Sequence, residues 1–102
     1  MSSSKPPKRP SPPSPKPGYR LLIDPDFLED LRYWITTNAK VAGKLTELME
    51  AVRRDPFAGI GKPEPLKWLG PGVWSRRITA EHRLVYRVEG EFIYLLQGRH
   101  HY

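Results

Sequence analysis

Hydrophobic residues are densest near the end of the chain, over Trp74–Tyr102. β-Branched and aromatic residues form three short runs there, separated by Thr79–Glu81 and by Glu89–Gly90. Runs of this composition with short breaks predict three antiparallel strands joined by hairpins. Glu89–Gly90 suits a two-residue turn, because glycine tolerates positive φ.

Alternation along these strands assigns side chains to faces. If residue 78 pairs with residue 82 across the first hairpin, Arg77 stands opposite Arg83 on one face. The other face is apolar and carries Ile78, Leu84, Tyr86, Val88, Ile93 and Leu95. Two adjacent guanidiniums repel each other unless an anion lies between them, and a phosphate is the obvious anion. The alternative is a pair of solvated arginines on an exposed sheet face.

The pattern before this sheet predicts one further strand, at Tyr19–Ile23, and a helix that follows it. Asp24 is a favourable N-cap and Pro25 a favourable first helical residue. An apolar stripe at helical spacing follows, made of Phe27, Leu31 and Trp34, with Leu28 and Ile35 flanking it. Tyr33 and Trp34 suggest two interpretations, a base-stacking site and ordinary core packing, and core packing is the commoner role for helix aromatics.

A second helix is predicted to begin near Asn38 or Ala39 and to end at Asp55, since Pro56 follows. Its apolar positions are Val41, Leu45, Leu48, Met49 and Val52. The expected fold is therefore α+β, with a two-helix hairpin packed on the apolar face of a small antiparallel sheet.

A long loop rich in proline and glycine is predicted at residues 55–73, with Pro63, Glu64 and Pro65 at its centre. The two prolines restrict the backbone on both sides of Glu64. A stiff backbone suits a catalytic carboxylate, because less entropy is lost when the group is positioned. The alternative is an ordinary solvent-exposed acid.

The 102 residues are enough for one domain with a modest core. There is no cysteine, no apolar run of membrane-spanning length and no signal-peptide pattern, so we expect a soluble cytoplasmic protein without membrane association. The net charge of +6 is uneven: residues 1–18 carry +4, residues 19–61 carry −1 and residues 62–102 carry +3. This distribution favours a polyanionic partner.

Residues 1–18 hold seven of the twelve prolines and, after Met1, no other apolar side chain. Such a segment cannot bury enough surface to offset the entropy of ordering, so a disordered basic arm is expected before a domain at 19–102. Three roles are open for the arm: a polyproline ligand, a tail that adds nonspecific RNA affinity, and a passive tail.

Neither a metal nor a cofactor is indicated. The three histidines are His82, His100 and His101, and they show neither cysteine partners nor the His-Glu-x-x-His spacing of a zinc site. There is also no glycine-rich phosphate loop and no serine nucleophile motif.

Three runs in the right order resemble the YoeB family of RelE/ParE-superfamily toxins from type II toxin–antitoxin systems. They are Asp55–Lys67, Trp74–Tyr86 and Arg99–Tyr102, and the resemblance extends over about residues 21–102. It implies a RelE-like microbial RNase fold and a ribosome-dependent mRNA endonuclease. It also implies three kinds of partner: mRNA in the A site of the 70S ribosome, a YefM-like antitoxin that neutralises the toxin, and a second copy in a homodimer.

The resemblance also implies roles for single residues in metal-free RNA cleavage. Glu64 is the base that removes the 2′-OH proton, Arg83 stabilises the phosphate in the transition state, and His101 is the acid that protonates the leaving 5′-oxygen. Lys67, Arg77 and Tyr102 match further RNA- or phosphate-binding positions of the family. The expected products are a 2′,3′-cyclic phosphate or 3′-phosphate and a 5′-hydroxyl.

Two points stay open at the sequence level. Alternation from Leu95 places Gln97, Arg99 and His101 on the core face, so either Gly98 marks a bulge or the tail leaves the sheet. His100 also competes with His101 for the role of acid. The alternative to an enzyme is a non-catalytic RNA- or ribosome-binding module, or a toxin-fold subunit of a repressor complex.

Overall fold

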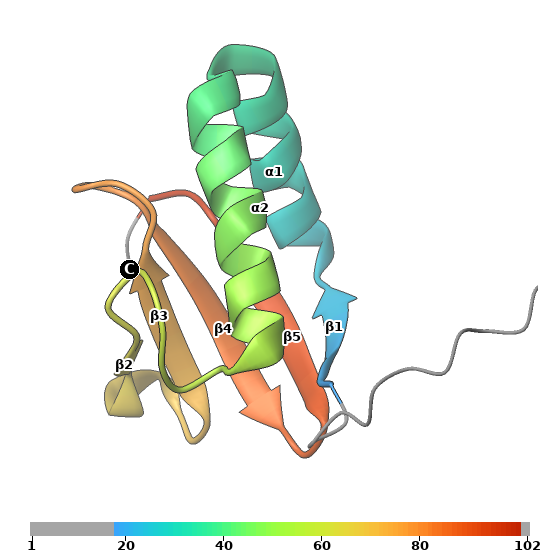
Figure 1. Ribbon diagram of the computed structural model, residues 1–102, viewed down its shortest axis with the longest axis vertical. Coiled ribbons are helices and arrows are strands. Elements are labelled where there is room, and N and C mark those ends of the chain that lie inside the picture. Colours follow the sequence, from blue (N-terminus) through green and yellow to red (C-terminus); the bar gives the residue numbers. More distant parts are fainter. Residues whose placement is uncertain (1–17, 101–102) are drawn as a thin grey trace, which may run out of the picture.

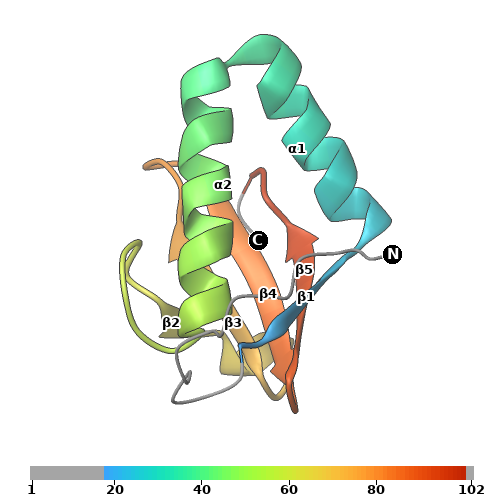
Figure 2. The same cartoon turned by 45° about the vertical axis from the view of Figure 1, so that its right-hand side comes forward.

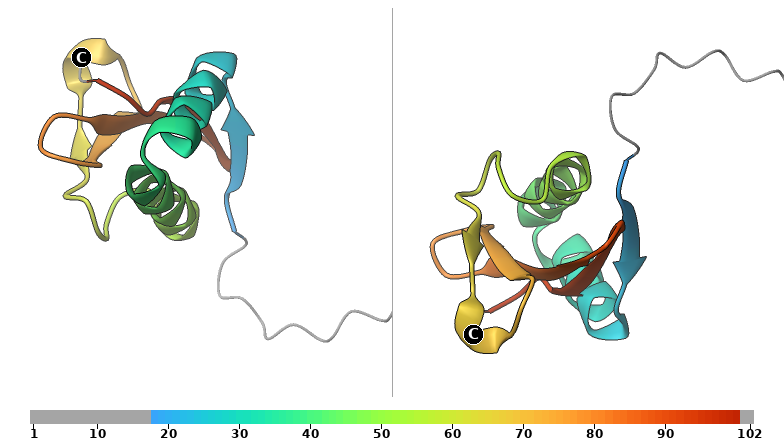
Figure 3. Two further views of the ribbon diagram at one scale, coloured as in Figure 1. Left: turned by 90° about the horizontal axis from the view of Figure 1, so that it is seen from above. Right: turned by 90° about the horizontal axis from the view of Figure 1, so that it is seen from below.

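The structure is a computed structural model that describes residues 18–100. Residues 1–17 of the expected arm, together with His101 and Tyr102, lie outside the described residues. The elements in chain order are β1 (Arg20–Ile23), α1 (Pro25–Thr37), α2 (Ala39–Arg54), β2 (Glu64–Pro65), the 3₁₀ turn η1 (Lys67–Leu69), β3 (Val73–Arg77), β4 (Arg83–Glu89) and β5 (Phe92–Gln97). The two helices cover one face of the sheet, and η1 lies on the other side (Figures 1 and 3).

The sheet has five strands in the order β1-β5-β4-β3-β2. The three predicted antiparallel strands are present as β3, β4 and β5, so this part of the expectation is confirmed. The expectation of a purely antiparallel sheet is wrong, because β1 pairs with β5 in parallel at one edge (Figure 2). At the other edge the two-residue β2 pairs antiparallel with β3. The fold is a two-layer α+β arrangement with a mixed sheet.

The pairing of Arg77 with Arg83 is confirmed. The second hairpin differs from the expected one, because Glu89 pairs with Phe92 and the turn is therefore Gly90–Glu91, with Gly90 at φ 61°. This difference moves the register by two residues. Since side chains alternate with a period of two, an even shift keeps Ile93 and Leu95 on their expected core face.

The helix boundaries follow their caps. The Asp24 carboxylate accepts a hydrogen bond of 2.9 Å from the Asp26 N–H, and Pro25 is the first residue of α1. Asn38 caps α2 by accepting from the Val41 N–H at 3.3 Å, and α2 ends at Arg54, before Pro56. Leu28 and Ile35, which flank the apolar stripe of α1, are exposed and do not join the core.

The main core lies between the helical hairpin and the sheet. Its buried residues are Phe27, Trp34, Ala42, Leu45, Leu48, Val52, Ile78, Leu84, Tyr86, Ile93 and Leu95. A second, smaller cluster lies on the opposite face of the sheet and is made of Leu66, Val73 and Val85, with Leu96 against it. We call this opposite face the open face. The second cluster anchors β2 and the start of η1 to the open face, where the arginine pair also lies.

Candidate active site

Glu64 and Arg83 are joined by an ion pair on the open face. The distance from Arg83 Nη2 to Glu64 Oε1 is 2.7 Å, across 19 positions of sequence. The Arg83 side chain is 16% exposed, whereas that of Glu64 is 55% exposed. The predicted base and the predicted phosphate-binding group are therefore in direct contact. The anion beside Arg83 in the free protein is a carboxylate supplied by the chain itself.

Strand register explains how these two side chains meet. Glu64 on β2 stands opposite Ser75 on β3, and Ser75 stands opposite Val85 on β4. Arg83 lies two residues before Val85 and so shares its face. Ser75 occupies the central position of this row. Its side chain points to the open face but is fully buried beneath its neighbours. A small side chain there leaves room for Glu64 to extend over β3 towards Arg83.

The other two predicted cationic site residues in the described part are exposed. Arg77 stands opposite Arg83 in the β3–β4 ladder. Lys67 is the first residue of η1, directly after the buried Leu66 that fixes this turn to the open face. The structure therefore places Arg77 beside the Glu64–Arg83 pair, and it places Lys67 three residues beyond Glu64 on the same connection.

The loop before Glu64 is held by an arginine for which the sequence analysis predicted no role. Arg76 is fully buried on the helix side of the sheet. Its guanidinium donates to the carbonyl oxygens of Ala58 and Ile60, both at 3.0 Å, and to that of Asp55 at the end of α2. Asp55 is the C-cap of α2, and carbonyl groups at a helix C-terminus favour a cation, so its carbonyl helps to compensate the buried charge of Arg76.

Tyr86 completes this support from the neighbouring strand. Its hydroxyl donates to the carbonyl oxygen of Pro56 at 2.7 Å and accepts from Arg76 Nε at 3.2 Å. Burial raises the pKa of this hydroxyl above its ordinary value of 10.0, and Arg76 opposes that effect. At the far end of the loop the Arg77 N–H donates to the Gly61 carbonyl at 2.7 Å. The connection that leads to Glu64 is therefore fixed near its start by Arg76 and Tyr86 and near its end by the backbone of β3.

A bulge at Leu96 reverses the face that alternation predicts for Gln97, the last residue of β5. Val85 pairs with Gln97 whereas Tyr86 pairs with Leu95, so Leu96 is the additional residue. The expected position of a bulge, Gly98, is two residues too late. The shift moves Gln97 from the core face to the open face, beside Val85. The Gln97 side chain, at the end of β5, is therefore on the same face as the arginine pair.

His100 is the last residue that the structure describes. It is exposed, its N–H donates to His82 Nδ1 at 2.6 Å, and its carbonyl accepts from the Arg83 N–H at 3.1 Å. The tail therefore runs alongside the start of β4. His101 and Tyr102 lie outside the described residues, so their predicted roles stay predictions. The choice between His100 and His101 as acid also stays open.

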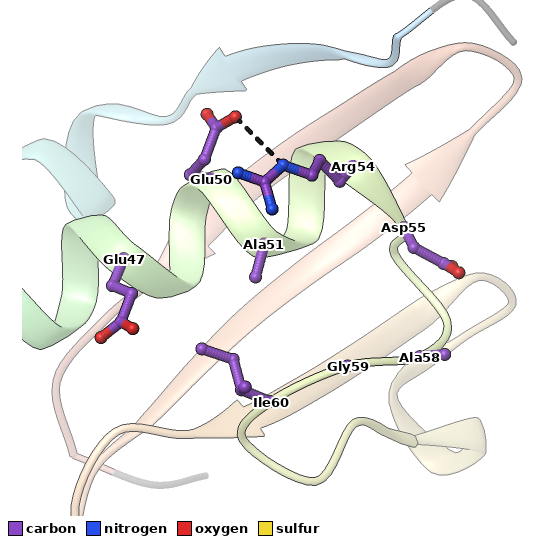
Figure 4. A pocket seen from close by; sticks show the side chains of 8 residues that line it. All are labelled: Glu47, Glu50, Ala51, Arg54, Asp55, Ala58, Gly59 and Ile60. Carbon is purple, nitrogen blue, oxygen red and sulfur yellow. Dashed lines mark ion pairs between the residues drawn. The ribbon is translucent and has the colours of Figure 1, made fainter. Parts of the chain in front are cut away.

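A hollow of about 520 Å³ lies elsewhere, between the end of α2 and the loop that follows it (Figure 4). It is lined by Glu47, Glu50, Ala51, Arg54, Asp55, Ala58, Gly59 and Ile60, and Glu50 forms an ion pair of 3.6 Å with Arg54 at its rim. None of the predicted site residues that the structure describes lines it. A polymeric substrate needs an open surface rather than an enclosed pocket, so the predicted chemistry does not require a cavity at Glu64.

Residues 18–100 contain neither a metal-binding cluster nor a membrane-spanning helix. No cluster of three or more His, Cys, Asp or Glu side chains is placed to hold a metal ion. Neither helix in this range has the length and apolarity of a membrane span.

The burial of Arg76 could have been predicted from the alternation of side chains along the strand. The pairing that sets Arg77 against Arg83 also sets Arg76 against Leu84, on the core face. No sequence pattern predicts the contact between His82 and the tail, because this contact depends on where the chain runs after the last strand.

Comparison with known proteins gives a consistent picture. A family model described as "YoeB-like toxin of bacterial type II toxin-antitoxin system" matches residues 23–102. The curated Toxin RelK of Mycobacterium tuberculosis is 49% identical over 80 residues, which cover 78% of this chain and 94% of that protein. Toxin YoeB of Escherichia coli K12 is 45% identical over 83 residues, covering 81% of this chain and 99% of that protein.

Solved structures agree with the sequence matches. The YoeB/ParE toxin from Agrobacterium tumefaciens superposes with a TM-score of 0.75 at 45% identity, covering 81% of this chain and 99% of that one. A YoeB dimer from Staphylococcus aureus has a TM-score of 0.74 at 38% identity, and a YoeB–YefM complex from the same organism has 0.72 at 40%. Both cover 82% of this chain and 98% of the compared chain.

Proposed function

The chain belongs to the YoeB-like toxins of bacterial type II toxin–antitoxin systems, and from this premise we propose that it is a ribosome-dependent mRNA endonuclease. The observation that carries the proposal is the ion pair of 2.7 Å between Glu64 and Arg83. RNA cleavage without a metal needs a base and a cation at the same phosphate. The fold brings one of each together on an open face.

In the proposed reaction Glu64 removes the proton of a ribose 2′-OH, and the resulting oxygen attacks the adjacent phosphorus. The bond to the 5′-oxygen breaks, and His101 protonates that oxygen as it leaves. An arginine guanidinium carries five N–H donors, so Arg83 can contact a phosphate oxygen while it remains near the base. The products are a 2′,3′-cyclic phosphate and a 5′-hydroxyl, and DNA is not cut because it lacks the 2′-OH.

Arg77 and Lys67 are proposed to bind flanking phosphates. Both are exposed and both lie close in the chain to the strands that carry the ion pair. Such contacts orient RNA and add affinity that falls with salt concentration. Tyr102 is proposed to contribute to the same RNA surface on the basis of the family resemblance alone.

The ribosome is proposed to supply the positioning that this open face lacks. Glu64 is more than half exposed on the open face. A flexible RNA would have to be held with its 2′-OH in line with the leaving oxygen, which is a large entropic requirement. We therefore expect cleavage of mRNA in the ribosomal A site and little cleavage of naked RNA.

The antitoxin partner is proposed to be of the YefM type. A structural relative of this chain has been solved as a YoeB–YefM complex, and another as a YoeB dimer. By analogy, a YefM-like protein neutralises this toxin, and a second copy of the toxin forms a homodimer.

Cleavage of a defined mRNA in a purified translation system tests the proposal. Wild-type protein should cut the message at a ribosome-occupied position and leave a 5′-hydroxyl end. Glu64→Gln should lower the single-turnover rate by about 10²- to 10⁴-fold, the usual contribution of a general base. Glu91→Gln, an exposed acid in the β4–β5 turn, is the matched control and should cut normally.

The acid is identified by comparing His101→Gln with His100→Gln on two substrates. One carries the ordinary 5′-oxygen, and the other carries sulfur in its place, which leaves without a proton. Sulfur should rescue His101→Gln and should not rescue Glu64→Gln. If the wild-type protein binds ribosomes without cutting any message, it is a binding module and not an enzyme.

A further inference from the structure

Residues 98–100 are tied to three separate parts of the fold. The Gly98 N–H donates to Asp30 Oδ2 at 2.9 Å, and the Gly98 carbonyl accepts from Trp34 Nε1 at 2.8 Å. Asp30 and Trp34 are one turn apart on α1, so a single helix face binds both the N–H and the carbonyl of Gly98. Gly98 is itself buried.

Gly98 also fits closely against the core. A Cβ atom at this position would lie 3.0 Å from the Phe27 ring and 3.0 Å from Leu45 Cδ2. The backbone therefore approaches the helical hairpin so closely that Phe27 and Leu45 would have to shift by a few tenths of an ångström to admit a Cβ atom. The chain cannot slide along α1 at this point without losing both hydrogen bonds and this contact.

His82 holds the next part of the tail. The imidazole accepts the His100 N–H at Nδ1, and its ring lies edge-on to Trp34, with 4.8 Å between centroids. His100 has φ 65°, which is uncommon for a residue with a side chain and needs local bonds to maintain it. Its carbonyl is bonded to the backbone N–H of Arg83. The two hydrogen bonds of His100 join the tail to Arg83, the predicted phosphate-binding group at the start of β4, and to His82 directly before it.

We propose that Asp30, Trp34 and His82 are positioning residues for the general acid. They fix the peptide that ends at His100, and His101 is joined to His100 by one peptide bond. This proposal rests on the proposed function, in which His101 protonates the leaving oxygen. In this contact the His82 imidazole acts as a hydrogen-bond acceptor through Nδ1.

The matched variants are His82→Asn and His82→Leu. Asparagine places its Oδ1 near the position of Nδ1 and keeps an acceptor for the His100 N–H, whereas leucine keeps the approximate size and removes the acceptor. On the oxygen substrate His82→Leu should cut at least about tenfold more slowly than wild type, because a poorly placed donor loses part of its 10²- to 10⁴-fold contribution. His82→Asn should retain most of the rate.

The sulfur substrate separates positioning from a general loss of structure. If His82 acts through the acid, sulfur at the 5′ position should restore His82→Leu to near the wild-type rate, as it does His101→Gln. A merely structural defect would slow both substrates equally. Trp34→Phe, which removes only the donor to the Gly98 carbonyl and part of the ring, should show the same rescue.

Hydrogen exchange of the His100 amide tests the contact without any cleavage. The amide should be protected in wild type and in His82→Asn and should exchange faster in His82→Leu. Equal slowing of the two substrates, or an unprotected His100 amide in wild type, would overturn the proposal even if RNA is cut. A protected amide in a wild-type protein that never cuts RNA would instead overturn the proposed function, and with it the catalytic purpose of the contact.

Discussion

Arg76 and Arg77 are consecutive residues of β3 that lie on opposite faces of the sheet. Arg76 is fully buried and bonded to loop carbonyls on the helix side, whereas Arg77 is exposed beside Arg83. The same residue type therefore serves two purposes within one dipeptide. The first organises the connection that leads to Glu64, and the second contributes charge to the open face.

Replacing Arg76 should destabilise the fold. Arg76→Met would leave the partly buried carbonyls of Asp55, Ala58 and Ile60 without this donor, and an unsatisfied polar group costs up to about 1–3 kcal/mol when it is buried. We expect a loss of about 3 kcal/mol or more in the free energy of unfolding, measured by urea denaturation. Arg77→Met should change it by less than about 0.5 kcal/mol, as exposed substitutions usually do. Equal losses in the two variants would contradict the assignment.

Arg83 should act on the chemical step, and the basic residues of the N-terminal arm should act only on association. Arg83→Ala should lower the single-turnover cleavage rate by about 10²-fold or more, the scale of one lost charge-stabilising donor. Neutralising Lys5, Lys8 and Arg9 together should leave that rate unchanged and flatten the salt dependence of binding. An arm variant that slows the chemical step as much as Arg83→Ala would refute this division.

Two glycine-to-alanine changes should have opposite effects. Gly98→Ala forces a Cβ against Phe27 and Leu45, and overpacking of this kind costs about 1–3 kcal/mol. Gly43→Ala lies in α2 with nothing within 4 Å of the new atom, so it should stabilise the protein by roughly 0.5–1 kcal/mol. Thermal unfolding of the two variants measures both. Only Gly98→Ala should also slow cleavage.

Stability should fall at alkaline pH partly because of Tyr86. The pKa of Tyr86 is raised in the folded protein. Its contribution to the free energy of unfolding is therefore complete below the ordinary pKa of 10.0 and is lost as pH rises through the pKa of the folded protein. Unfolding free energies measured between about pH 8 and pH 11 should therefore decline with pH above about 10. Tyr86→Phe should make that decline shallower, and Tyr94→Phe, on the open face, should have a smaller effect. Identical slopes in all three proteins would argue against a buried Tyr86 hydroxyl.

Local signals predicted much of this fold. Asp24 and Pro25 mark the start of α1, Pro56 marks the limit of α2, and alternation places Arg77 against Arg83. These features depend on residues near one another in the sequence. They need no knowledge of the rest of the chain.

Features that depend on distant segments were not predicted. The parallel pairing of β1 with β5 has no local pattern, and the bulge at Leu96 lacks the glycine that usually marks one. The two-residue β2 lies beside Pro63, a residue type that argues against a strand. The proximity of Glu64 and Arg83 follows from these distant pairings, so only the family resemblance pointed to it. The roles of His101 and Tyr102 stay predictions.

The pairing of β1 with β5 has a consequence for biosynthesis. The strand that begins the domain forms its sheet bonds only with the strand that ends it, and α1 contacts the chain as late as Gly98. A nascent chain still attached to the translating ribosome cannot form these contacts until its C-terminal residues have emerged. The contacts between chain ends also lengthen the loops that must close before folding is complete. Folding of the domain therefore requires β5 and Gly98 to have left the ribosome, and a truncated chain that lacks β5 lacks the partner for its first strand.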